Sequence, residues 1–237
     1  MIRLVLKCLA VQFGAGERVP YGAQQRHLGE LCRADAKAQG QRVVLAGWEV
    51  AGGGDTAQAR WYSLELTRED IPWAYARGDP FRSIASLELL ATLICVLVFE
   101  PRHGTSTAGT LSLTAGGDNK SNGFTLDRTS TTKFPLYLVL MEVAAQLRDR
   151  NLVLGVAWRP RGENEEADAL TNGNFAAFSA SRRVTVEWSS LRLMVLPRLV
   201  AAAMELFAEL QEARRAQRHK APGPQPKRAR LRERDPW

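Results

Sequence analysis

The stretch Ile84–Phe99, IASLELLATLICVLVF, is apolar at almost every position and decides how the chain folds. A run of this composition predicts a helix that is buried on most of its surface. Glu88 is the exception, because an ionised carboxylate inside an apolar helix is costly unless it is paired or bound to a metal. The run is too short to span a bilayer and carries this acid, so we expect a core helix of a soluble protein, with no membrane partner.

Three strands are expected before this helix, and no helix interrupts them. The first is short, weak in propensity and ends at Asp35, and Gly40 marks the turn after it. The run Gly52-Gly53-Gly54-Asp55 is a clear turn signal before the third strand. The three segments form an antiparallel meander over residues 30–66, with strands at 31–36, 42–50 and 57–66.

Two crossover units are expected after the core helix. Each has a strand, and the first strand is followed by Gly116-Gly117-Asp118, where the glycines let the backbone turn and present the carboxylate. The second strand is a near-continuous apolar run, typical of burial on both faces. The order predicts an α/β fold with a mixed five-stranded sheet, an antiparallel meander plus crossover strands flanked by helices. The segments are strand 109–114, a short helix or irregular turn at 119–129, a helix from Pro135, strand 151–158 and helix 163–171.

The chain divides into four parts by composition. We expect an N-terminal helix at 2–13 and a connection within 1–29, and the α/β domain at 30–175. We expect a helical extension at 176–219, with a long helix from about 197 to 218, and a basic disordered tail at 220–237. The formal net charge is +7, and nine Lys or Arg against three acids in residues 211–237 account for +6 of it. Such a tail attracts nucleic acid or serves in nuclear import, although a solvated end explains it equally well.

The cysteines and the N-terminus indicate the compartment. Cys8, Cys32 and Cys95 lie far apart and have no metal-ligand spacing, so we expect reduced thiols and an intracellular protein, nuclear or cytoplasmic. Arg3 and Lys7 interrupt the apolar start, which therefore does not resemble a signal peptide.

Four acids occupy unusual positions, and we expect them to converge. Asp35 and Asp118 are expected at strand ends, where sites of such sheets collect. Glu88 is expected on the helix packed against the sheet, and Asp168 on the last short helix of the domain. Carboxylates held together repel one another, and divalent cations relieve this repulsion. Mg²⁺ is the usual partner of carboxylates and phosphates, with Mn²⁺ as an alternative, and two ions about 4 Å apart support phosphoryl transfer.

Four motifs in this order resemble a ribonuclease H domain of the type found in retroelement polymerases. The fragments are RADAKA, SLELLA, TAGGDNKSN and WRPRGENEEADALTNG, and together they span about residues 30–173. The resemblance implies a ribonuclease H-like fold and hydrolysis of the RNA strand of RNA–DNA hybrids, without a covalent intermediate. It also implies a polymerase or another retroelement domain as a partner. The catalytic and metal-binding set that it implies is Asp35, Glu88, Asp118 and Asp168.

The chain departs from that family in two ways. Many members carry a histidine before the last acid, but none lies between Trp158 and Asp168, and no Tyr-x-Asp-Asp polymerase motif occurs. These departures leave open a catalytically inactive binding or scaffold domain, and the fold also leaves open a related DNA nuclease or transposase.

The individual residues have structural alternatives. Glu88 could pair with Arg82 or Arg33, Asp118 could be a turn residue, and Asp55 could be mistaken for Asp35. Glu163, Glu165 and Glu166 compete with Asp168. Trp48, Trp61, Trp73 and Trp158 fit either base stacking or the core. Contacts to a hybrid's phosphates and sugars are expected from Asn119, Asn122, Arg159, Arg161 and Asn164.

Overall fold

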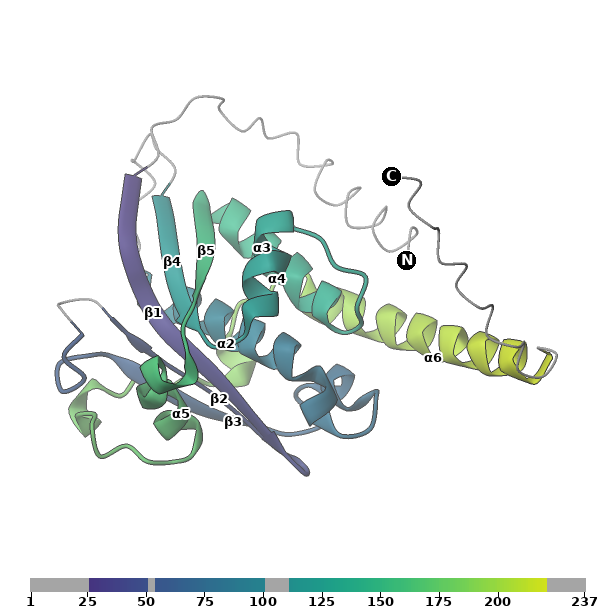
Figure 1. Ribbon diagram of the computed structural model, residues 1–237, viewed down its shortest axis with the longest axis horizontal. Coiled ribbons are helices and arrows are strands. Elements are labelled where there is room, and N and C mark those ends of the chain that lie inside the picture. Colours follow the sequence, from purple (N-terminus) through teal and green to yellow (C-terminus); the bar gives the residue numbers. More distant parts are fainter. Residues whose placement is uncertain (1–25, 51–53, 101–110, 221–237) are drawn as a thin grey trace, which may run out of the picture.

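The computed structural model describes residues 26–50, 54–100 and 111–220, which form a five-stranded mixed sheet with helices against it (Figure 1). The strand order is β3-β2-β1-β4-β5; β1, β2 and β3 are antiparallel, whereas β4 runs parallel to both β1 and β5. This is the predicted meander followed by two crossovers, and the predicted fold class is confirmed. The strands are β1 Arg26–Gln39, β2 Arg42–Glu49, β3 Trp61–Leu66, β4 Leu111–Gly117 and β5 Leu152–Trp158.

Helices cover both faces of the sheet. On one face α2 packs against β1 and β2, α4 packs against α2, and α6 packs against α4. The short α3 lies on this same face, against β5 and α2, whereas α5 packs against β1 and β2 on the other face. The helices are α2 Ile84–Phe99, α3 Lys120–Arg128, α4 Leu136–Asp149, α5 Glu165–Thr171 and α6 Leu196–Lys220. Short 3-10 helices cover Pro72–Tyr75, Pro80–Ser83, Arg161–Glu163, Ala180–Arg182 and Trp188–Ser190.

Helix α2 is the centre of the larger hydrophobic core, as its composition predicts. Most of its side chains are buried, and the Tyr62 hydroxyl donates a hydrogen bond of 2.8 Å to the Ala91 carbonyl. By length and composition alone, the helical stretch Pro80–Phe99 could cross a membrane. Its burial under the sheet instead explains its apolar sequence.

The prediction that Asp35 ends the first strand is wrong. Strand β1 continues to Gln39, because its pairing with β2 extends from Cys32 to the turn at Gly40. The parallel pairing of β1 with β4, however, stops at Arg33. Asp35 therefore lies inside the antiparallel half of the sheet but just beyond the end of the parallel half.

The prediction that β5 is buried on both faces is also wrong. Val153 and Trp158 are each 45% exposed, because β5 is an edge strand with β4 as its one partner in the sheet. The predicted helix at 2–13, the first two residues of the strand expected at 109–114 and nearly all of the basic tail lie outside the described residues.

The C-terminal helix begins inside the main core. Leu196 and Ala203 of α6 are buried there, whereas residues beyond Leu210 are mostly exposed, and the helix extends past the rest of the domain (Figure 1). The fully buried Glu142 of α4 accepts hydrogen bonds from the backbone N–H groups of Met194, Val195 and Leu196, at 2.7 to 2.9 Å. A carboxylate of α4 thus caps the start of α6.

Candidate metal centre

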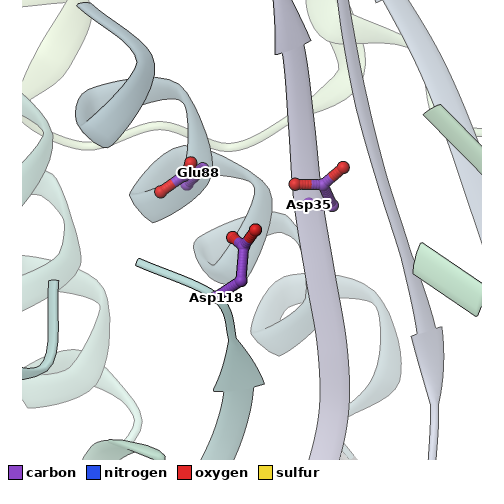
Figure 2. Close-up of side chains that lie close together, drawn as sticks. All are labelled: Asp35, Glu88 and Asp118. Atoms are coloured by element: carbon purple, nitrogen blue, oxygen red, sulfur yellow. The ribbon is translucent and has the colours of Figure 1, made fainter. Parts of the chain in front are cut away.

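Asp35, Glu88 and Asp118 come together from three different elements (Figure 2). Asp35 belongs to β1, Glu88 to the second turn of α2, and Asp118 follows the last residue of β4. Each offers one carboxylate oxygen such that the three oxygens lie within 4.8 Å of one another. The structure therefore brings three of the four predicted acids into one cluster.

The glycine before this cluster is required by close packing. A Cβ atom on Gly116 would lie 2.5 Å from a carboxylate oxygen of Glu30 and 3.0 Å from the Arg33 side chain. A larger residue would therefore displace these two side chains, whereas glycine leaves them in place between β4 and β1. Asp118 follows two residues later, directly after the end of β4, and lies beside Asp35.

Burial and like charge raise the pKa values of two acids in the cluster. Burial is the main cause for Glu88, whose pKa rises to about 8; Asn119 opposes the rise by hydrogen bonding, and Asp118 and Asp35 add to it. The pKa of Asp35 rises to about 6, again chiefly by burial, although a hydrogen bond of 3.0 Å from the Thr171 hydroxyl counteracts it. Both carboxyls therefore hold protons more tightly than usual in the absence of a cation.

No basic side chain within the described ranges neutralises the cluster. Arg33 pairs instead with Glu30 and Glu166, and Glu88 forms no ion pair with Arg82 or any other described residue. The proposed structural pairing of Glu88 is thus not what the structure shows. Asp55 accepts a hydrogen bond from the Ala57 N–H and is a turn residue.

The donor set fits a hard divalent cation. The three carboxylates offer oxygen ligands of the kind that Mg²⁺ and Mn²⁺ prefer. Buried Asn122 donates from Nδ2 to Glu88 at 3.3 Å, and its Oδ1 has no hydrogen-bond partner. Glu88, Asp118, Asn119 and Asn122 share the lining of one small pocket.

Asp168 lies beside the cluster and not among its three members. Its carboxylate pairs with Arg161 at 3.3 Å and accepts a hydrogen bond of 2.9 Å from Asn172. Its charge still contributes to the raised pKa of Asp35. Of its competitors on the same segment, Glu163 pairs with Arg159 and Glu166 with Arg33.

The five predicted nucleic-acid contacts have different surroundings. Asn119 caps α3, where its side chain accepts a hydrogen bond from the Ser121 N–H. Asn122 and Asn164 are buried, and Asn164 donates to the Ala34 carbonyl at 3.3 Å. Arg159 pairs with Glu30, and Arg161 is the exposed partner of Asp168.

The tryptophans separate into two kinds. Trp48, Trp61 and Trp73 are core residues, no more than 2% exposed. Trp158 is 45% exposed at the end of β5, its indole N–H donates to the Asp118 carbonyl at 3.0 Å, and Lys120 lies 3.8 Å above its ring.

Sequence reasoning missed Lys120 and Thr171 as neighbours of the acids. Lys120 could have been found because it follows Asp118 by two residues. Thr171 could not, because no local sequence feature indicates its contact with Asp35.

Neither a protein-family model nor a curated protein matches the sequence. Among solved structures, the chain is similar to RNase H1 from the halophilic archaeon Halobacterium salinarum NRC-1, with 16% identity and a TM-score of 0.40, over 65% of this chain and 98% of that one. It is also similar to the N-terminal RNase H domain of a Mycobacterium tuberculosis protein, with 19% identity and a TM-score of 0.37. This match covers 63% of this chain and 94% of the other.

Proposed function

We propose that this protein is a metal-dependent endonuclease of the ribonuclease H type, which hydrolyses the RNA strand of RNA–DNA hybrids with Mg²⁺ or Mn²⁺. The observation that carries the proposal is the cluster of Asp35, Glu88 and Asp118, whose oxygens lie within 4.8 Å of one another without a basic partner among the described residues. Three unneutralised carboxylates beside a sheet are an unstable arrangement unless cations complete it.

The side chains of such a site would have two roles, cation binding and the orientation of the ligands. The three carboxylates would hold the cations, while Asn122 and Thr171 fix the orientation of Glu88 and Asp35 by their hydrogen bonds. When bound, the metal supplies an activated nucleophile and stabilises the charge that develops on the scissile phosphate. Asp168 would become a fourth ligand if Arg161 paired with a substrate phosphate in place of Asp168.

The retroelement origin and a polymerase or other retroelement partner are part of this proposal. Their support is the sequence pattern Asn164-x-x-Ala167-Asp168, with Asn164 buried against β1 and Ala167 buried in the core. The second metal ion is likewise proposed, with Asp168 as its additional ligand.

The test is a cleavage assay on labelled RNA–DNA hybrid, duplex DNA and duplex RNA, each with Mg²⁺ and with EDTA. We expect cutting of the hybrid's RNA strand alone, dependent on the metal and lost in Asp118→Asn. Isothermal titration with Mg²⁺ gives a second readout, because Asp118→Asn should weaken metal binding as well. Circular dichroism establishes that each protein is folded.

Each other result has a defined meaning. A folded protein that binds the hybrid without cutting it supports the inactive scaffold alternative. Cutting of duplex DNA supports the DNA nuclease or transposase alternative. Unchanged hybrid cleavage by Asp118→Asn would place the chemistry outside the acidic cluster.

Lys120 is expected to contact the backbone of the bound nucleic acid. It is exposed above Trp158, next to the Asp118 turn, where its charge can meet a phosphate. We expect Lys120→Gln to weaken hybrid binding about fivefold. The slope of log affinity against log salt concentration should fall by about one, because one fewer counterion is released. The measurement is fluorescence anisotropy in Ca²⁺ over a range of salt, and Arg128→Gln, exposed at the other end of α3, is the control. Equal effects of the two substitutions would refute a specific contact.

A further inference from the structure

A groove with a volume of about 320 Å³ lies between the start of α4 and the second half of α6. None of its lining residues belongs to the acidic cluster. The long α6 forms one wall, and the helix continues past the groove beyond the body of the domain (Figure 1). This volume is in the range of specific binding sites.

The floor of the groove is apolar. Phe134 and Phe207 stack on each other with ring centroids 4.3 Å apart, so one face of each ring is already covered. Leu210 extends the apolar surface outward and is 45% exposed. An aliphatic side chain of a partner would gain burial here.

The rim of the groove is basic. Arg77, Lys133 and Arg214 line it, no acid does, and none of the three forms an ion pair within the parts of the chain that the structure describes. Unpaired like charges around an apolar floor are complementary to an apolar segment flanked by acids.

We propose that this groove binds an acidic, amphipathic segment of another protein, which inserts an apolar side chain against Phe207 and Leu210 and meets the basic rim with its carboxylates. The chain's own terminal segments have the wrong charge to occupy it. Residues 1–25 contain three basic residues against one acid, and residues 221–237 contain five against two. The occupant therefore comes from a partner of opposite charge.

The probes are two labelled helical peptides with the same leucine stripe, one flanked by glutamates and the other by lysines. Their binding to the full chain is measured by fluorescence anisotropy. We expect the glutamate peptide to bind at least about tenfold more tightly than the lysine peptide, with an affinity that falls as salt rises. Leu210→Glu and Arg214→Glu should each weaken its binding by about tenfold or more. Arg215→Glu is the matched control, because Arg215 is exposed on the same helix but does not line the groove.

Three results would overturn the proposal. Equal binding of the two peptides, or binding of neither, would show that the groove does not select an acidic segment. Loss of hybrid binding in Arg214→Glu but not in Arg215→Glu would make the groove a nucleic-acid surface. A dimer in sedimentation that Leu210→Glu dissociates would identify a second copy of this chain as the occupant. Hybrid cleavage is measured on the same variants and is expected to be unchanged, which separates this test from that of the nuclease.

Discussion

Replacing Glu88 with glutamine is expected to abolish hybrid cleavage while it stabilises the metal-free protein. Loss of one metal-holding carboxylate should lower the cleavage rate by at least about 10³-fold, because metal stabilisation of the reacting phosphate is worth several kcal/mol. Asp168→Asn is the informative comparison. Asp168 is paired with Arg161 outside the three-acid cluster, so its loss is expected to reduce the rate less.

The gain in stability follows from the pKa of Glu88. Its value rises from 4.5 to about 8 in the folded protein, chiefly by burial, so the folded state binds this proton more tightly than the unfolded state does. The metal-free protein must therefore lose stability as the pH rises from about 4.5 to about 8, and the loss is complete above that range. Glutamine carries no charge at any pH. The variant should thus match the wild type at pH 4.5 and exceed it by about 5 kcal/mol above pH 8.

Urea unfolding at the two pH values, with EDTA and with Mg²⁺, provides the measurement. Mg²⁺ should stabilise the wild type by binding to its folded state, and it should stabilise Glu88→Gln less. Glu69→Gln, at an exposed position, is the control and should change neither property. A Glu88→Gln protein that is less stable than the wild type above pH 8 would show that the charged carboxylate is well accommodated without a metal.

Replacing Glu142 is expected to cause the largest loss of stability. Its carboxylate is fully buried and accepts three backbone hydrogen bonds at the start of α6, as well as one of 2.6 Å from the Gln146 amide. Glu142→Ala removes the shared acceptor of these four donors, including the buried Leu196 N–H, and we expect a loss of about 3–5 kcal/mol. Glu142→Gln keeps one acceptor oxygen but places its amide N–H₂ group against the other N–H donors. We expect it to lower the stability somewhat less than Glu142→Ala does.

Denaturant unfolding and limited proteolysis would test this role together. If Glu142 fastens α6 to α4, cleavage within residues 196–217 should become faster in both variants. The exposed Glu205→Gln on the same helix is the control and should leave both measurements unchanged. Wild-type stability in Glu142→Gln would mean that packing alone holds α6 in place.

The features that sequence predicted well are those with local causes. The apolar run of α2 is buried because few other environments accept it. Asp118 directly follows β4, although the two glycines expected after the strand are its last two residues. The short polar α3, the helix after Pro135 and the long α6 were also predicted close to their observed bounds. Each of these signals is carried by a few adjacent residues.

The errors concern properties that distant pairing determines. An apolar strand such as β5 looks the same in sequence at the edge and in the centre of a sheet, and only the strand order makes Val153 exposed. The true length of β1 depends on partners in β2 and β4. The ion pair of Asp168 with Arg161 is likewise a contact that the sequence pattern did not predict.

The pairing of β1 with β4 has a consequence for how the protein is made. The register that joins Arg33 to Gly116 closes a loop of about 80 residues, so it forms only after most of the domain has emerged from the ribosome. A nascent chain that ends before Asp118 carries Asp35 and Glu88 but lacks the third acid. Because the acids lie so far apart in the chain, no early fragment can hold the complete metal set. The proposed nuclease activity would therefore be absent during biosynthesis until the sheet is assembled.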